Sequence, residues 1–276
     1  MQRILLTLDP SKYSKNALHY ASEIARYHHS KVEGIAILDK LSVIEAVTTF
    51  VPLPLGVEDH MDKEKELFAD ARKKIKNEIA SFKRYCKQNE LDCSARVYEG
   101  KPEYILEEES KYFDLIITGL RNFFHFETAE HPEKMISQFI ANTSTPLLAV
   151  PQEYRPIKNV LFAFDGSLPS FRAIKSFLQL MQNTPYQLTI LIAKNNSKEA
   201  NKLLNKIDEY IQLHDNLKVI KQHSKKSLIK AFDEDYLQDT DLVVCGMHSQ
   251  NILQKVFVGS FTQHIININK IPVFIA

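Results

Sequence analysis

Two glycines and a serine lie close together near the end of the chain. Gly246 follows the apolar run "DLVVC", and the pair Gly259-Ser260 opens a helix-like segment shortly afterwards. The chain has only 7 glycines among its 276 residues, so placing two of them here calls for a reason. A glycine after a strand lets a ligand approach the backbone, and the N–H groups of a helix N-terminus attract anions. The order predicts a phosphate site; the alternative is a loop glycine followed by an ordinary serine N-cap.

A carboxylate follows an apolar run earlier in the chain. Asp165 comes directly after "NVLFAF" and begins the stretch "DGSLPS". At the end of a strand it would face a cleft, where it could accept a hydrogen bond from a ligand hydroxyl or help to hold a metal ion near phosphates. Gly166 allows a tight turn, and Ser167 can cap the helix that follows. The alternative is that Asp165 only orders this turn.

The elements around these residues occur twice in the sequence. Asp9 in "RILLTLDPSKYS" matches Asp165, at an offset of 165 − 9 = 156. Gly119 in "FDLIITGL" matches Gly246, at an offset of 246 − 119 = 127. Self-similarity over this length indicates a duplicated domain rather than a solenoid.

The two matches also show where the copies differ in length. The offset falls by 156 − 127 = 29, so the first copy carries about that much additional sequence, within residues 38–72. We call residues 1–152 the first repeat and residues 153–276 the second repeat, and we expect each repeat to be one domain.

Apolar strands and amphipathic helices alternate within each repeat. Strands are predicted at 3–8, 31–38, 92–100, 113–118 and 146–150, and at 159–164, 186–193, 217–222, 241–246 and 272–276. Helices are predicted at 63–89, 102–112 and 133–143, and after each of the two matching aspartates. Continuously apolar strands between helices indicate a parallel sheet that is covered on both faces. Such sheets bind ligands beyond the carboxyl ends of the strands, where the strand order reverses.

Composition excludes some classes of protein. Lys and Arg number 35 against 34 for Asp and Glu, so the charge does not favour a nucleic-acid-binding surface. Cys86, Cys93 and Cys245 form no C-x-x-C pair, which predicts structural thiols in a reducing compartment. The first apolar run stops at Asp9, too soon for a signal-peptide core or a membrane span. We therefore expect a cytoplasmic protein with no membrane partner.

The motif residues of the second repeat resemble the universal stress protein family, in its tandem form. The nucleotide-binding branch of that family carries G-x2-G-x9-G-(S/T), and Gly246, Ser249 and Gly259-Ser260 stand at the same spacing. Ser249 replaces the second glycine, and serine reaches positive φ less freely than glycine. The resemblance covers nearly the whole chain, and the early aspartate of the family matches Asp165.

The resemblance implies a fold, a ligand and a set of contacts. The fold would be two tandem five-stranded parallel-sheet domains, Rossmann-like and similar to the adenine nucleotide alpha hydrolases, that form a pseudo-dimer. The ligand would be ATP with Mg²⁺, the metal meeting Asp165 only indirectly, through the nucleotide. The contacts would come from Asp165, from the backbone near Ala193 beside the adenine, and from Gly246, His248, Ser249, Gly259, Ser260 and the backbone of Phe261 at the phosphates.

The first repeat departs from the same motif. Asn122 stands where the second glycine belongs, and Glu133-Lys134 replaces the Gly-Ser pair. Pro10 follows Asp9 in place of the glycine that follows Asp165. A glutamate at a helix N-terminus satisfies the helix dipole from within the protein and would repel a triphosphate. We expect that the first repeat does not bind ATP in the usual way.

Three functions compete for this sequence. The first is a stress-response regulator that binds an adenine nucleotide and is not an enzyme. Slow ATP hydrolysis could still occur, but not as its main role. The second is an interaction or scaffold protein of the same fold that binds no nucleotide. The third is an adenylating ligase, but the short loop after "NVLFAF" lacks the glycine- and serine-rich pyrophosphate loop of that class. A metal site within "HFETAEHPE" is an alternative to a solvated loop there, although its spacing fits no closed ligand set.

The final strand of each repeat, "PLLAV" or "PVFIA", is apolar and would lie at the edge of its sheet. Exposed apolar edges invite pairing with another strand. The resemblance suggests that single-domain relatives dimerise through this strand, so two repeats in one chain can satisfy each other, with Leu148 and Phe274 near the contact. A homodimer through another surface and an unidentified protein partner stay open. The apolar stretch "LSVIEAVTTFVPLPLG" could cover a cleft, bind a partner or pack in the core.

Overall fold

The computed structural model describes residues 1–40, 57–121, 143–182, 184–212, 217–247 and 259–276, with side chains from residue 61 in the second range. The first repeat contains β1 (Arg3–Thr7), α1 (Lys12–His28), β2 (Lys31–Leu38), α3 (Val57–Gln88), β3 (Cys93–Glu99), α4 (Pro102–Ser110), β4 (Leu115–Gly119) and β5 (Leu147–Val150). The second contains β6 (Asn159–Ala163), α6 (Leu168–Leu180), β7 (Gln187–Ala193), α7 (Ser197–Ile211), β8 (Lys218–Ser224), α8 (Leu228–Ala231), the π-helix η1 (Phe232–Tyr236), β9 (Leu242–Cys245), α9 (Ser260–Ile268) and β10 (Val273–Ile275).

All the predicted strands are present, with ends that agree to within about two residues. The long helix α3 begins at Val57, which is 63 − 57 = 6 residues earlier than predicted. Three predicted features fall outside the described residues. They are residues 133–142 of the predicted helix at 133–143, the stretch "HFETAEHPE" and the whole apolar segment 41–56.

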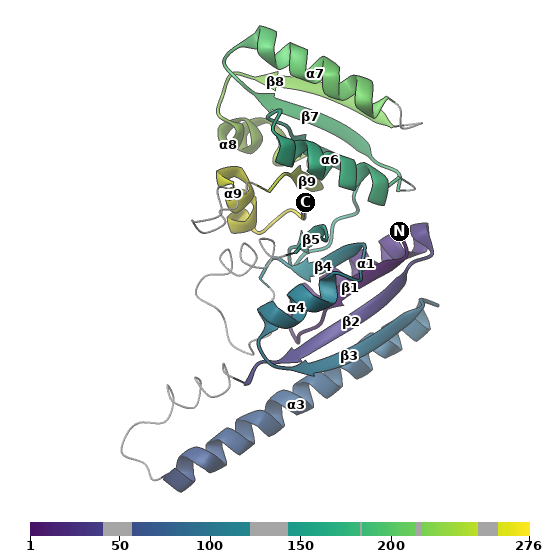
Figure 1. Ribbon diagram of the computed structural model, residues 1–276, viewed down its shortest axis with the longest axis vertical. Coiled ribbons are helices and arrows are strands. Elements are labelled where there is room, and N and C mark those ends of the chain that lie inside the picture. Colours follow the sequence, from purple (N-terminus) through teal and green to yellow (C-terminus); the bar gives the residue numbers. More distant parts are fainter. Residues whose placement is uncertain (41–56, 122–142, 183, 213–216, 248–258) are drawn as a thin grey trace.

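The strands form one sheet of ten in the order β3-β2-β1-β4-β5-β10-β9-β6-β7-β8 (Figure 1). Every neighbouring pair is parallel except β5 and β10, which run antiparallel at the centre. The order within the second repeat mirrors the order within the first. The α/β class, the two tandem five-stranded parallel sheets and their joining into a pseudo-dimer are therefore confirmed.

The central pair joins the residues that the sequence predicted. Phe274 lies opposite Leu148 in the antiparallel ladder, and Val273 and Ile275 lie opposite Ala149 and Leu147. The side chains of Phe274 and Leu148 are fully buried, and the ring of Phe274 packs edge-on against Phe177 of α6 at 5.2 Å between centroids. The two repeats thus share one continuous core across this seam.

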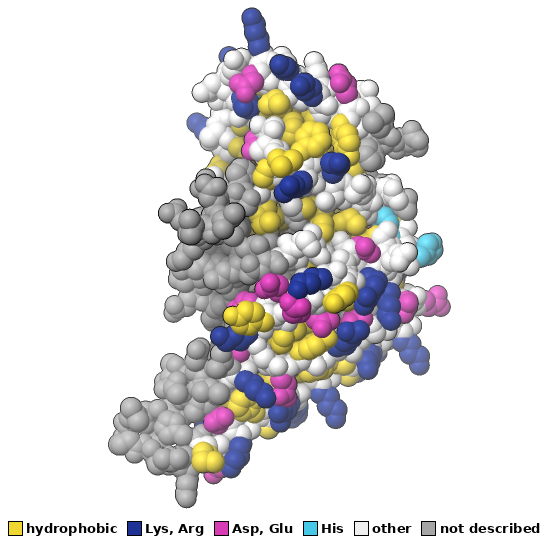
Figure 2. Space-filling model, viewed as in Figure 1, with side chains coloured by type: hydrophobic (Ala, Val, Ile, Leu, Met, Phe, Trp, Pro, Cys, Tyr) yellow, Lys and Arg dark blue, Asp and Glu magenta, His cyan; other side chains and the backbone are white. Residues whose placement is uncertain are grey.

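Helices cover both faces of the sheet, as continuously apolar strands require. One core cluster lies between the sheet and α1, α3, α6 and α7, and the other lies under α4, η1 and α9. Within the described part of the chain, no helix is both long enough and apolar enough to cross a bilayer. Acidic and basic side chains intermingle over the face in Figure 2, as the near-zero net charge predicts.

One sequence prediction is wrong. Cys86 and Cys93 are joined by a disulfide, whereas the composition predicted three thiols. The reason is local: α3 ends just before Asn89, the chain reverses in a short turn through Glu90 at φ 54°, and β3 begins at Cys93. That reversal brings the two cysteines together. Cys245 is a buried thiol, as predicted.

Candidate functional site

The strand order places a topological switch point in each repeat. The order of the second repeat reverses between β6 and β9, so the loops after these two strands diverge at their carboxyl ends. Asp165 follows β6 and Gly246 follows β9. The structure therefore brings both predicted residues to the switch point, where open α/β sheets bind ligands.

Asp165 orders the turn between β6 and α6. Its Oδ1 accepts hydrogen bonds from the backbone N–H of Ser167 at 2.8 Å and from the hydroxyl of Ser170 at 2.7 Å. Ser167 in turn caps α6, its Oγ accepting from the N–H of Ser170 at 3.3 Å. Asp165 is nevertheless exposed at the carboxyl end of the strand. The carboxylate thus has the structural role that was the alternative interpretation, in a position that a ligand can reach.

The backbone of Gly166 favours glycine in this turn. Its φ is +84°, in the left-handed region that side chains disfavour. A Cβ built on it would lie 2.9 Å from Cδ2 of Leu203 on α7, the end of a flexible side chain that can move aside. The need for a glycine after Asp165 therefore comes from the local backbone conformation.

The matching aspartate of the first repeat is buried, although the turn that follows it reaches the surface at Pro10. Asp9 is only 6% exposed, and its Oδ1 accepts from the N–H of Ser11 at 2.8 Å. The backbone N–H of Asp9 donates to the hydroxyl of Ser14 at 3.1 Å. Pro10 occupies the place of the glycine and cannot adopt positive φ. Both repeats have an aspartate at this position, but only the aspartate of the second repeat is exposed to solvent.

Ala193 ends β7 at the same edge of the sheet. The register between β6 and β7 stops at Ala163 and Leu191, so Ala193 lies 193 − 191 = 2 residues beyond it. The next residue, Lys194, donates its N–H to the carbonyl of Ser224 on β8 at 3.0 Å. Successive residues of a strand point their backbone groups to opposite sides, so those of Ala193 face the open side beyond β6. This is the geometry that a backbone contact to a ligand needs.

Gly246 is in close contact with the start of α6. A Cβ built on it would lie 2.4 Å from the backbone carbon of Pro169 and 2.4 Å from the backbone nitrogen of Ser170. Such distances leave no room for any side chain. The sequence predicted that a glycine at position 246 lets a ligand approach the backbone. In the structure the residue that packs against Gly246 is the start of α6, and this contact holds the Asp165 turn beside β9.

The N-terminus of α9 supplies the other side of the site. Gly259 is its N-cap, with extended backbone at φ −55° and ψ 150°, and has no side chain to cap the helix. Ser260, the first helical residue, is exposed. The ring of Phe261 is buried and meets Phe232 edge-on at 5.5 Å, so only the backbone of Phe261 could contact a ligand.

Two predicted phosphate contacts, His248 and Ser249, lie outside the described residues, as do Asn122, Glu133 and Lys134 of the first repeat. Among the described residues, no group of three or more His, Cys, Asp and Glu side chains could hold a metal ion.

Two residues beside Ala193 were missed by sequence reasoning. His223 donates from Nε2 to the carbonyl of Lys194 at 2.7 Å, since a carbonyl oxygen only accepts. The ammonium group of Lys194 pairs with Glu199 at 2.7 Å. These contacts fix the backbone just after Ala193 and join residues 223 − 194 = 29 positions apart, a pairing that no local pattern signals.

A buried thiol lies next to Gly246 at this edge of the sheet. Cys245 immediately precedes Gly246, and burial raises the pKa of its thiol to about 12, against a smaller lowering by the Thr262 hydrogen bond. The group is therefore a thiol near neutral pH, and thiolates rather than thiols are nucleophiles.

Known proteins resemble this chain over nearly its whole length. No family model matches the sequence. A universal stress protein of Synechocystis sp. is 22% identical over 291 aligned residues, which cover 99% of this chain and 99% of that protein. Among solved structures, a universal stress protein from Archaeoglobus fulgidus has a TM-score of 0.67 at 13% identity, covering 99% of this chain and 97% of the other.

A second solved structure has similar size. A functionally unknown protein from Pseudomonas aeruginosa has a TM-score of 0.61 at 11% identity, covering 100% of this chain and 92% of the other. Both solved chains span the two repeats together. The comparisons therefore confirm the resemblance of this chain to the universal stress protein family in its tandem, two-domain form.

Proposed function

We propose that the second repeat, residues 153–276, is a domain that binds an adenine nucleotide, ATP with Mg²⁺, and that the protein is a cytoplasmic stress-response regulator rather than an enzyme. The first repeat, residues 1–152, is then a related domain that does not bind ATP in the usual way. As a regulator, the protein would also bind a protein partner, whose identity this proposal leaves open.

The start of α9 is the observation that carries this proposal. Helices α6 and α7, which follow the other strands of the site, are capped by their own side chains at Ser167 and Asn196. Helix α9 begins at Ser260, and its N-cap residue, Gly259, has no side chain that could cap the first N–H groups. A helix N-terminus whose N-cap residue leaves these groups open, with its positive dipole end, is a ready site for phosphate.

The remaining contacts of the site fit a nucleotide. Asp165 is exposed at the end of β6, where its carboxylate can accept from a ribose hydroxyl or reach the metal ion through water. The backbone of Ala193 faces the space beyond β6, where the base would lie. His248 and Ser249 lie on the chain between Gly246 and α9, and the motif spacing assigns them to the phosphates.

The contrast between the repeats supports one site per chain. Asp9 is buried where Asp165 is exposed, and Pro10 stands where Gly166 provides positive φ. In the sequence, Glu133 of the first repeat stands at the position of Gly259, the N-cap residue of α9 in the second. A carboxylate at that position would compete with phosphate for the helix N-terminus.

Release of bound nucleotide tests the proposal. The purified chain is denatured, and the supernatant is analysed by anion-exchange chromatography for adenine nucleotides. The native chain is first loaded with Mg-ATP and desalted, and it should then release up to one nucleotide per chain. Gly259→Glu treated in the same way should release none. Equal retention by both proteins, or by neither, counts against a phosphate site at α9.

A further inference from the structure

The disulfide between Cys86 and Cys93 joins two elements at one edge of the molecule. Cys86 lies in the last turn of α3, and Cys93 is the first residue of β3, the outermost strand of the first repeat. The bond therefore closes the helix-to-strand turn at residues 87–92.

The two cysteines differ in their exposure to solvent. Cys86 is 4% exposed and belongs to the core cluster under α3, whereas Cys93 is half-buried on the outermost strand and packs against the same cluster. Cys93 is the more accessible of the two residues, so its sulfur is the one that a small thiol would attack. The Cys86 sulfur would be the leaving group and would remain in the core as a thiol, which packs there as a small apolar group.

Non-covalent contacts hold the same turn together. The N–H of Leu91 donates to the carbonyl of Cys86 at 3.0 Å, and the N–H of Val32 on β2 donates to the carbonyl of Asp92 at 2.9 Å. Arg26 of α1 donates to the side-chain oxygen of Asn89 at 2.7 Å. The turn thus has its own hydrogen bonds and keeps its average shape without the disulfide, but without the bond it opens more often.

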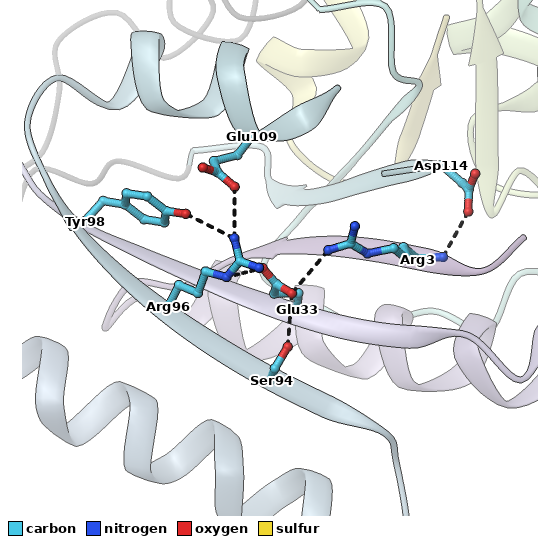
Figure 3. Close-up of polar contacts among 7 residues, drawn as sticks. All are labelled: Arg3, Glu33, Ser94, Arg96, Tyr98, Glu109 and Asp114. Atoms are coloured by element: carbon cyan, nitrogen blue, oxygen red, sulfur yellow. Dashed lines mark hydrogen bonds and ion pairs between the residues drawn. The ribbon is translucent and has the colours of Figure 1, made fainter. Parts of the chain in front are cut away.

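Strand β3 is also fixed to the sheet by a buried carboxylate. Glu33 on β2, with a side chain 5% exposed, pairs with Arg96 at 2.9 Å and accepts from Ser94 at 3.1 Å (Figure 3). Arg96 reaches on to Glu109 of α4 at 3.4 Å. Breaking the disulfide would leave β3 paired with β2, so what it would free is the end of α3.

We propose that Cys86 and Cys93 are a reversible dithiol–disulfide pair that locks the last turn of α3 to the edge strand β3. The partner reagent is a low-molecular-weight thiol and its disulfide. A thiolate attacks the Cys93 sulfur, the Cys86–Cys93 bond breaks, and Cys86 leaves as a thiolate that takes a proton. A second thiolate then attacks the mixed disulfide and releases Cys93, so two small thiols become one small disulfide and the protein gains two thiols. Oxidation is the reverse.

The size of the loop favours reversibility. The two cysteines are only 7 positions apart. A short connection keeps the two reduced thiols close to each other, because the entropy cost of closing a loop grows with its length. The bond can therefore form again after reduction by exchange with a small disulfide.

A thiol titration tests the proposal on the intact chain. The protein is equilibrated with glutathione and glutathione disulfide at graded ratios, and exchange is stopped with acid. The chain is then unfolded and alkylated, and mass spectrometry gives the number of alkylated cysteines. We expect a single transition between one and three alkylated cysteines, unchanged in Cys245→Ala apart from the missing group, and absent in Cys93→Ser. A chain with three thiols at every ratio, or with the disulfide intact at every ratio, overturns the proposal.

Hydrogen exchange tests the lock itself. Peptides that cover the end of α3 and the start of β3 are compared in the oxidised and reduced chain, with peptides from β6 and α6 as the control region. We expect exchange at least about tenfold faster near residues 82–92 after reduction, and no change in the control region. Equal exchange in both states, or faster exchange throughout the chain, overturns the lock.

Discussion

Phe274 on β10 lies directly opposite Leu148 on β5, and this antiparallel pair joins two sheets whose other strands are all parallel. Each strand alone would be an apolar sheet edge. Together they convert two five-stranded sheets into one sheet of ten. The seam also fixes the second repeat relative to the first, although the proposed nucleotide site lies on the strands beyond it.

Truncation after Lys270 removes β10 and should expose β5. The residues lost include Phe274, which is fully buried at the seam. We expect the truncated chain to aggregate or to form dimers through the exposed strand, as measured by size-exclusion chromatography with light scattering. Removal of Ala276 alone is the control: it loses the hydrogen bond from the N–H of Met247 to the carbonyl of Ala276, but β10 ends at Ile275 and stays paired with β5, so the chain should remain monomeric. A truncated chain that stays monomeric contradicts the paired-edge account.

A second contact across the seam can be measured as a coupling energy. Asn269 donates from Nδ2 to the hydroxyl of Tyr13 at 2.6 Å, joining the C-cap of α9 to the first turn of α1. Tyr13→Phe and Asn269→Gly each remove this bond, and glycine keeps the left-handed backbone of position 269, at φ 53°. We expect a double-mutant cycle from urea denaturation to give a coupling of about 1 kcal/mol. Additive effects within error would show that the bond contributes nothing to the seam.

Gly246→Ala should disturb the site through the fold. The new Cβ would meet the backbone of Pro169 and Ser170 at 2.4 Å, so the start of α6 has to move. We expect a loss of about 1 to 3 kcal/mol in the free energy of unfolding, which is typical of overpacking, together with weaker nucleotide binding. Gly259→Ala is the matched control, since its backbone is one that alanine adopts, and should cost less than about 1 kcal/mol. Equal stability losses in the two variants would refute the packing role of Gly246.

The sequence predicted the strands because they are apolar runs with clear boundaries. "PLLAV" and "PVFIA" indicated apolar sheet edges, and the resemblance to universal stress proteins implied that the two edges pair with each other. The sequence did not predict the contact of Gly246 with Pro169, because that distance depends on how α6 packs beside β9. The bond between Cys86 and Cys93 was missed for a related reason: its geometry depends on where α3 ends and on the left-handed Glu90.

Alkaline pH should weaken the contact between α1 and the link between the repeats. The hydroxyl of Tyr20 donates to the carbonyl of Arg155 at 2.9 Å and accepts from its N–H at 3.0 Å. Burial raises the pKa of Tyr20 to about 12, with the Arg155 hydrogen bond opposing the shift. The folded chain therefore keeps the proton to higher pH than the unfolded chain, so the stabilisation is complete below about pH 10 and is lost as the pH rises toward 12.

Urea denaturation at several alkaline pH values measures this effect. Tyr20 should account for a loss of roughly 1.4 kcal/mol for each pH unit in that window. Tyr20→Phe removes the titrating group, so the free energy of unfolding of the variant should fall less steeply with pH. Parallel slopes for the two proteins would show that Tyr20 does not titrate differently in the folded and unfolded chains.

Calorimetric titration of the intact chain with Mg-ATP tests the central proposal most directly. One site per chain is expected, because Gly259 provides no side-chain cap for the start of α9 and Asp165 is exposed, whereas Asp9 of the first repeat is buried. Gly259→Glu, which gives the second repeat the glutamate of the first, should abolish the binding heat and leave the thermal unfolding midpoint of the ligand-free chain essentially unchanged. Absence of binding to the native chain at millimolar ATP, or binding that persists in Gly259→Glu, would contradict the account.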